Sequence, residues 1–283
     1  MELQLVIVVV LAVAVGLSLG LLGGGGSILT VPLLAYVAGM EPQEAIAASL
    51  FVVGTTSLIS TIMHARRGNV RWRTGVIFGV AGMAGAFLGG LLGGHLPGTV
   101  LMVAFALMMV ATAIAMIRGR KARDPEDKRG DLPLARIILD GLVVGLVTGL
   151  VGAGGGFLVV PALALLGGLP MPVAVGTSLL VIAMKSAAGL AGYLTTVSLD
   201  WPLVIAVTLA AIVGALIGAR LTARVPETVL RQGFGIFMLV MGAFVLYQEL
   251  PVPTPLVAAI AIAGIVGLTI RLRNNRKKVN AEP

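Results

Sequence analysis

Apolar segments long enough to cross a membrane occupy most of this 283-residue chain. Each runs for about 20 residues between short polar connections, which is the length an α-helix needs to cross about 30 Å of hydrocarbon. The chain is 58% hydrophobic and 11% charged, and its mean hydropathy is +1.06, far above that of soluble domains. The sequence therefore predicts an all-α, polytopic membrane protein without a soluble catalytic domain.

One of these apolar segments contains a cluster of four glycines. The stretch GLLGGGGSILTVPLL, residues 20–34, places Gly23 to Gly26 inside a segment that otherwise resembles a membrane-spanning helix. Each glycine costs about 1 kcal/mol in a helix interior relative to alanine, so the helix is expected to break there. Irregular backbone at membrane depth is tolerated only where protein or a water-filled cavity satisfies its polar groups, so the break indicates an internal site.

The glycine cluster has a second copy later in the chain. The stretch GLVGAGGGFLVVPAL, residues 149–163, follows the same plan, and Pro161 follows Pro32 by 129 residues. Over residues 16–39, 13 of 24 positions are identical at this spacing, against roughly a tenth expected by chance. The spacing also carries both tryptophans, Trp72 onto Trp201, without a gap. The chain therefore contains an internal duplication.

Hydropathy divides the chain into a first transmembrane repeat (1–117), a cytoplasmic linker (118–136), a second repeat (137–250), and a final transmembrane helix with a basic cytoplasmic tail (251–283). Each repeat begins with a glycine-broken segment, 3–38 or 137–166. Three helices are expected to follow, at 42–63, 74–93 and 99–117 in the first repeat and at 172–194, 202–221 and 232–250 in the second.

The basic residues alternate between equivalent loops of the two repeats. HARRGNVRWR, residues 64–73, carries four arginines, whereas its counterpart around Asp200 carries none; the next pair of loops reverses this pattern. Because basic loops favour the cytoplasm, the repeats are predicted to be inverted, with the N-terminus outside and the C-terminus cytoplasmic in the inner membrane. Each glycine cluster is then either the tip of a re-entrant hairpin or the joint between two full crossings.

Other features have simpler interpretations. The net charge of +8 lies mainly in loops and the tail, so nucleic-acid binding is not expected. Neither glycine cluster completes a nucleotide-binding motif. Pairs such as Gly85 with Gly89, and Gly214 with Gly218, have the spacing of close helix packing. His64 and His95 fall at loop edges, where both are expected to be solvated.

Inverted repeats with broken helices are typical of secondary transporters, in which the N-terminal ends of half-helices bind anionic groups. Here the half-helices are expected to begin near Ser27 and Phe157. On the following helix of the first repeat, Ser49, Thr56 and Ser60 share one face, and the second repeat presents Ser178, Lys185 and Gly189. The predicted substrate-binding residues are Gly24, Gly25, Gly26, Ser27, Ser49, Thr56, Ser57, Gly154, Gly155, Gly156, Ser178, Lys185 and Ser186.

Lys185 is the one charged residue deep within a predicted span. Intramembrane charges cost about 2.5 to 3.5 kcal/mol on insertion scales and usually mark a substrate, ion or proton pathway. Burial without a partner disfavours the charged form of a lysine, so anion and proton are expected to bind together. The alternative is a structural ion pair with Asp140. No metal site or cofactor is expected, and a homodimer is compatible with the sequence.

The glycine and proline motifs, followed by AASLFVVGTTS in the first repeat and GTSLLVIAMKS in the second, resemble the sulfite exporter TauE/SafE family of membrane permeases. The resemblance covers nearly the whole chain. It implies a transporter, usually an exporter, of sulfur-containing anions such as sulfite or sulfonates, embedded in membrane lipid. The prediction is therefore a non-enzymatic secondary transporter of small anions. The alternatives are an anion channel and a membrane-embedded accessory or scaffold protein.

Overall fold

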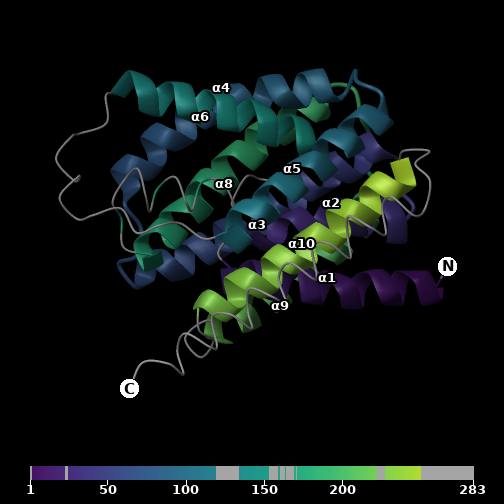
Figure 1. The fold of residues 1–283 in the computed structure, drawn as a ribbon, viewed down its shortest axis with the longest axis horizontal. Coiled ribbons are helices and arrows are strands. Elements are labelled where there is room, and N and C mark those ends of the chain that lie inside the picture. The colour runs from purple at the N-terminus through teal and green to yellow at the C-terminus, as the bar shows by residue number, and fades with distance from the viewer. Residues whose placement is uncertain are drawn as a thin grey trace. The chain divides into compact units, whose positions relative to one another are not determined.

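The computed structural model describes residues 2–22, 25–118, 134–152, 159, 163, 169, 171–221 and 227–249. The described chain falls into two units, residues 1–101 with 121–230, and residues 102–120 with 231–283. Every regular element in the described ranges is helical (Figure 1). The prediction of an all-α protein is thus confirmed.

The first repeat contains a long helix, a series of short turns and three further helices. Helix α1 covers Glu2–Leu22, and the broken part that follows consists of η1 (Gly25–Leu29), α2 (Thr30–Pro32) and η2 (Leu33–Val37). Then come α3 (Pro42–Arg66), α4 (Trp72–Gly93) and α5 (Gly98–Arg118). The 3-10 helix η1 begins at Gly25, inside the glycine cluster and two residues before the expected start near Ser27.

The helices of the second repeat begin at the positions that the duplication predicts. They are α6 (Leu134–Val151), α8 (Met171–Tyr193), α9 (Trp201–Leu221) and α10 (Glu227–Glu249). The starts of α8, α9 and α10 each follow those of α3, α4 and α5 by 129 residues. The expected start of a half-helix at Phe157 lies outside the described residues.

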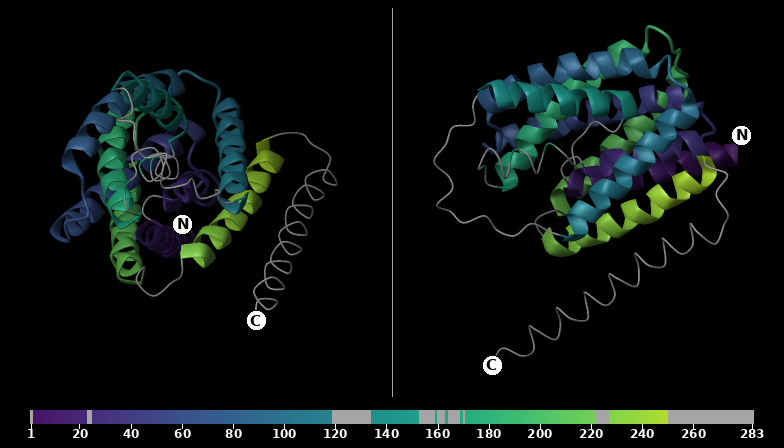
Figure 2. Two further views of the ribbon diagram at one scale, coloured as in Figure 1. Left: turned by 60° about the vertical axis from the view of Figure 1, so that its left-hand side comes forward. Right: turned by 45° about the horizontal axis from the view of Figure 1, so that its top comes forward.

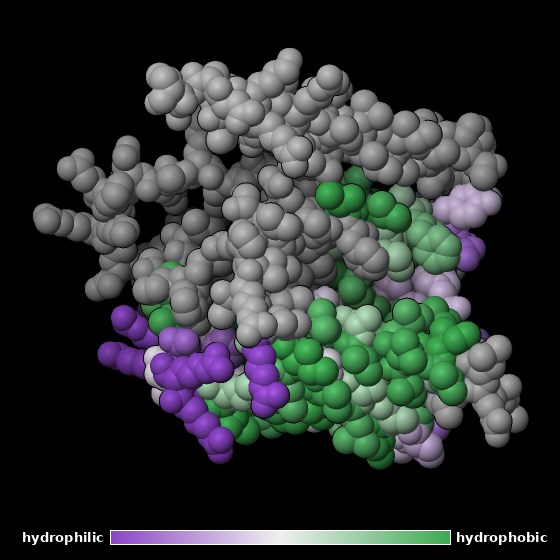
Figure 3. Space-filling view, turned by 90° about the horizontal axis from the view of Figure 1, so that it is seen from below, coloured by the Kyte–Doolittle hydropathy of each residue, from purple (hydrophilic) through white to green (hydrophobic). Residues whose placement is uncertain are grey.

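Four described helices are long and apolar enough to cross a bilayer: α3, α4, residues 173–193 of α8 and residues 201–220 of α9. Large apolar side chains project outward from these helices, among them Leu58, Val80, Leu209 and Val213. Figure 3 shows one face on which hydrophobic side chains cover a broad area and hydrophilic ones gather at one edge. Such a surface suits contact with lipid tails. The chain is thus a multi-pass membrane protein.

The first helix of each repeat packs against the third helix of the other. A methyl group added at Gly16 of α1 would lie 2.0 Å from the backbone oxygen of Ala211 in α9, and one added at Gly145 of α6 would lie 2.1 Å from that of Gly82 in α4. A methyl group added at Gly85 of α4 would come equally close to the backbone of α6, and one added at Gly214 of α9 equally close to the backbone of α1. The pairs α1–α9 and α4–α6 are therefore equivalent backbone-to-backbone contacts (Figures 1 and 2), as small residues in membrane helices permit.

The second helices of the two repeats, α3 and α8, pack against each other in opposite directions. Gly54, at mid-length of α3, lies beside Ser186 of α8, while Gly176 near the start of α8 lies beside His64 near the end of α3. Helix α8 also packs along α4, from Gly75 beside Leu180 to Gly93 beside Tyr193. The larger unit is thus organised around the crossing of α3 and α8.

The two ends of the larger unit differ in charge. The connection between α3 and α4 carries exposed Arg66, Arg67, Arg71 and Arg73, and it is tied to the start of α8 by a bond from the Arg71 amide to Thr177 Oγ1 (3.0 Å). We call this the arginine end. At the opposite end, the amide of Asp200 donates to Glu44 near the start of α3. We call this the acidic end.

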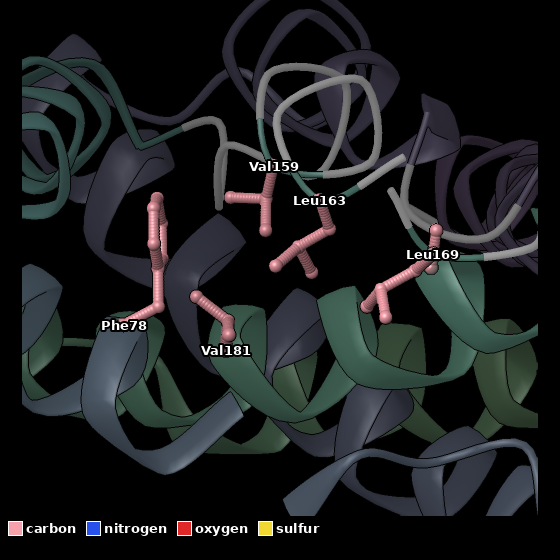
Figure 4. Close-up of a cluster of buried hydrophobic side chains, with 6 residues drawn as sticks. Phe78, Val159, Leu163, Leu169 and Val181 are labelled. Atoms are coloured by element: carbon pink, nitrogen blue, oxygen red, sulfur yellow. The ribbon is translucent and has the colours of Figure 1, made fainter. Parts of the chain in front are cut away.

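Described residues of the second broken segment pack against α4 and α8. Val159, Leu163 and Leu169 form a buried cluster with Phe78 of α4 and with Ala174 and Val181 of α8 (Figure 4). In the smaller unit, Gly242 of α10 lies against Ala106, Met109 and Val110 of α5.

One expectation about a loop-edge residue is wrong. His95 is exposed as expected, but His64 is only partly exposed, and its Nδ1 is buried without a hydrogen-bond partner in the described part of the chain. The reason is that α8 packs over the end of α3, where Gly176 lies against His64. The sequence alone does not show this contact between repeats.

Candidate functional site

Lys185 is buried in the middle of the larger unit, with 1% of its surface exposed, and it is the one charged residue among the buried side chains that the structure describes. Its aliphatic stem lies against Gly82 of α4, where an added methyl group would come within 2.5 Å of Cδ. Its ammonium nitrogen lies 3.4 Å from Thr148 Oγ1 of α6. The ammonium is thus held among α4, α6 and α8.

Side chains of α3 and α8 also bond the last residues of α6, near Thr148. Ser49 of α3 donates to the carbonyl of Gly152 (3.1 Å), and Tyr193 of α8 donates to the carbonyl of Leu150 (2.6 Å). Gly152 has φ +73°, the left-handed conformation that commonly ends a helix. Carbonyls at a helix C-terminus carry partial negative charge, so this end of α6 stabilises the Lys185 ammonium.

Three buried hydroxyl oxygens have no hydrogen-bond partner among the described residues: Thr30, Ser57 and Ser186. Ser57 and Ser186 occupy equivalent positions in α3 and α8, and the Ser186 side chain lies at the crossing of these helices, beside Gly54. A buried polar group without a partner costs about 1 to 3 kcal/mol. A polar ligand at the crossing would relieve that cost.

The structure brings together only part of the predicted site. Lys185 and Ser49 contact the end of α6 at Thr148 and Gly152, respectively, and Ser186 lies at the α3–α8 crossing. Thr56 donates instead to Val52 of its own helix (2.6 Å), and Ser178 donates to Val175 (2.7 Å). Ser27 is buried, and Gly25 and Gly26 lie in η1. The remaining predicted positions, Gly24, Gly154, Gly155 and Gly156, lie outside the described residues.

Two residues that contact Lys185, Gly82 and Thr148, are absent from the sequence-based prediction, and so is Tyr193, which bonds the end of α6. Thr148 is a lone hydroxyl in an apolar helix, and nothing local distinguishes it from a threonine that bonds its own backbone. A weak signal exists in the duplication, because its counterpart in the first repeat is Leu19. The side chain of Asp140, the alternative partner of Lys185, lies outside the described residues. The described residues contain no group of three His, Asp or Glu side chains that would suit a metal ion.

Comparison with known proteins identifies the family. The sequence profile of the family described as "Sulfite exporter TauE/SafE" matches residues 8–245. A protein of Xylella fastidiosa named "Probable membrane transporter protein" is 35% identical over 258 residues, which cover 87% of this chain and 96% of that protein. A "Probable membrane transporter protein" of Methanocaldococcus jannaschii is 33% identical over 184 residues, which cover 62% and 67% of the two chains.

A third relative, the "Probable membrane transporter protein YunE" of Bacillus subtilis, is 29% identical over 204 residues, 64% of this chain and 75% of that protein. No solved structure matches the chain. The names of these relatives indicate a membrane transporter rather than an enzyme. With a profile match over most of its length and multi-pass helices, the chain belongs to the sulfite exporter TauE/SafE family of membrane transporters.

Proposed function

We propose that this protein is a secondary transporter that exports a small sulfur-containing anion, such as sulfite or a sulfonate, with Lys185 as the residue that attracts it. The observation that carries the proposal is the burial of this cation: its one hydrogen bond to a described residue is with a neutral hydroxyl. A buried charge is costly unless it is paired. A bound anion supplies the opposite charge.

The surroundings of Lys185 support an oxyanion. Buried hydroxyls that lack described partners, Ser57 and Ser186, lie on the helices that cross near it, and hydroxyls donate readily to anionic oxygens. The family's description as a sulfite exporter favours a sulfur oxyanion and the export direction. We also expect a proton to bind to Lys185 together with the anion, because the anion stabilises the charged form of the lysine.

The broken segments add the second part of the proposal. Broken helices line the substrate site in many transporters, and their N-terminal ends attract anions. The helical turns that begin with η1 at Gly25 continue into α2 and then η2, and Ser27 in η1 is buried. We therefore place the predicted glycine positions, including Gly24 and Gly154 to Gly156, close to the substrate path.

The arrangement of charges supports an inverted topology. Equivalent helices α3 and α8 run in opposite directions, as repeats related by an axis in the membrane plane would. The arginine end of the larger unit is then cytoplasmic, and the acidic end, with Glu44 and Asp200, is outside. Helices α1 and α9 run in the same direction, since Gly16 and Gly20 meet Ala211 and Ala215 in turn.

Flux measurements test the transporter proposal. A carrier alternates access to a central site, so purified protein in liposomes should show saturable sulfite uptake and should exchange labelled sulfite against an internal unlabelled pool. A channel gives large single-channel currents in a planar bilayer and no counterflow. An accessory protein gives no flux of sulfite or sulfonate at all. Large single-channel currents without counterflow, or no flux of sulfite or sulfonate, would overturn the proposal.

Single cysteines test the topology, because the chain contains no cysteine of its own. A membrane-impermeant reagent applied outside whole cells should label Asp200→Cys and should leave Arg67→Cys unmodified until the membrane is broken. Equal labelling of the two positions from outside would contradict the inversion.

A further inference from the structure

Lys185 occupies a space that only a glycine in α4 leaves open. A methyl group at Gly82 would lie 2.5 Å from Lys185 Cδ and 2.9 Å from Cγ, well inside van der Waals contact. The aliphatic stem of the lysine therefore passes directly over the backbone of α4. Any larger residue at position 82 has to displace this stem, and with it the ammonium group.

Thr148 fixes the other end of the lysine side chain. Its hydroxyl donates to the carbonyl of Gly145 in the preceding turn (3.2 Å). A hydroxyl has one hydrogen, so toward Lys185 Nζ it acts as the acceptor. Thr148 stands in the last turn of α6, and its own carbonyl accepts the amide of Gly152 (3.0 Å). The hydroxyl thus holds the ammonium at the negative end of the α6 dipole.

The first repeat supplies an internal control for this arrangement. The equivalents of Lys185, Thr148 and Gly82 are Thr56, Leu19 and Ala211, so all three positions differ together. Leu19 and Ala211 are buried, and Thr56 bonds its own helix. Packing glycines around them, by contrast, are kept: Gly16 corresponds to Gly145, and Gly85 to Gly214. The space at Gly82, the hydrogen-bond acceptor at Thr148 and the cation of Lys185 therefore occur together around Lys185, and their equivalents lack all three.

An ammonium group has three N–H donors. Thr148 takes one of them, in a bond of 3.4 Å, which is longer than the usual range of about 2.7 to 3.2 Å and therefore weak. The remaining donors meet no other described residue, so they suit the oxygens of an anion while the threonine keeps the group in place. A neutral hydroxyl suits this role, because a carboxylate in its position would compete with the anion for the charge.

We propose that Thr148 and Gly82 are positioning residues for anion binding: Gly82 gives the Lys185 stem its path, and Thr148 holds the ammonium where the anion meets it. The inference rests on the proposed function of Lys185 as the anion-attracting residue. It adds that anion affinity depends on two neutral residues of α4 and α6 that act through the lysine alone.

Sulfite uptake into proteoliposomes tests the role of Thr148. Thr148→Val keeps the shape but removes the acceptor, and we expect the KM for sulfite to rise about tenfold with little change in maximal rate. Thr148→Ser restores the hydroxyl and should restore the KM. The matched control is Thr208→Val in α9, a buried threonine that also bonds its own helix; its KM should stay at the wild-type value.

A double-mutant cycle separates positioning from a general structural effect. In a Lys185→Ala background, Thr148→Val and Gly82→Ala should leave the KM for sulfite where Lys185→Ala alone puts it, because both residues act through the lysine. Gly82→Ala alone should raise the KM. Thermal unfolding without sulfite checks that each variant is folded. Where Thr148→Val fails to fold, Thr148→Ala takes its place in the cycle.

The outcomes distinguish the proposed function of Lys185 from the positioning roles of Thr148 and Gly82. If Lys185→Ala keeps the wild-type KM, the proposed function of Lys185 is wrong, and the positioning inference is wrong with it. If Lys185→Ala loses sulfite while folded Thr148→Val and Gly82→Ala keep the wild-type KM, only the positioning inference is overturned. The positioning inference would also be overturned if Thr148→Val raised the KM for sulfite by the same factor in the wild-type and in the Lys185→Ala background.

Discussion

The contact of α4 with α6 and the contact of α9 with α1 are built from equivalent residues and have the same geometry, yet their surroundings differ in polarity. Gly85 meets the backbone of Leu142 as Gly214 meets that of Val13, each at 2.0 Å for an added methyl group. Lys185 and Thr148 lie beside the first contact, and their equivalents in the first repeat are Thr56 and Leu19. The two repeats thus share the glycines that bring the helix backbones together, which we call the scaffold, but they differ in the polar residues near them.

This difference separates residues that hold the helices together from residues that we assign to the substrate. Packing residues follow the duplication, because both halves need the same backbone approach. Polar residues that act on a ligand are free to differ, because a single anion needs a single cation. On the proposed function, the second repeat supplies the charge, and the first repeat supplies hydroxyls such as Ser49, which donates to the end of α6.

The largest expected effect comes from breaking the shared scaffold. Gly85→Val and Gly214→Val each place a side chain against a backbone carbonyl that cannot move aside. Each should cost more than about 3 kcal/mol of stability and should leave little folded protein. The matched control is Ala84→Val, whose side chain is exposed on the neighbouring face of α4. Size-exclusion profiles and thermal unfolding of detergent-purified protein measure the difference; a stable Gly85→Val protein would contradict the close contact.

Moving the cation to the first repeat tests whether the chemistry depends on the set of three residues. Thr56→Lys alone puts a lysine at the position equivalent to Lys185, in a repeat where Ala211 and Leu19 stand for Gly82 and Thr148, and should destabilise the protein by about 3 kcal/mol. Adding Ala211→Gly and Leu19→Thr should recover part of that loss. Thermal unfolding of the single and triple variants measures the recovery. A triple variant no more stable than Thr56→Lys would show that these neighbours do not determine where a buried lysine is tolerated.

The smallest effect concerns the equivalent hydroxyls of Ser57 and Ser186. Both are buried without a partner among the described residues, so Ser57→Ala and Ser186→Ala should each stabilise the protein without sulfite by about 1 kcal/mol. If these hydroxyls bind the anion, the same changes should weaken sulfite uptake, a trade of activity for stability. Destabilisation by either change would mean that the hydroxyl has a structural partner.

The sequence predicts the scaffold better than the site, for physical reasons. Helix positions follow from hydropathy and from the 129-residue spacing, and packing follows from glycine spacing, since both signals are local. Lys185 is found because a charge inside an apolar span is conspicuous. Thr148 and Gly82 are not, because their roles depend on α6 and α4 lying beside α8, which involves contacts between repeats. The displacement of His64 from solvent has the same cause.

Anion binding by Lys185 variants is the most direct test of the account. Thermal stability of purified protein, measured with and without sulfite, should show a sulfite-dependent increase in wild type. The increase should vanish in Lys185→Ala, with affinity lowered about thirtyfold or more. It should persist in part in Lys185→Arg, whose guanidinium keeps the charge but differs in shape. Full sulfite stabilisation of a folded Lys185→Ala protein would contradict the central claim that this buried cation binds the anion.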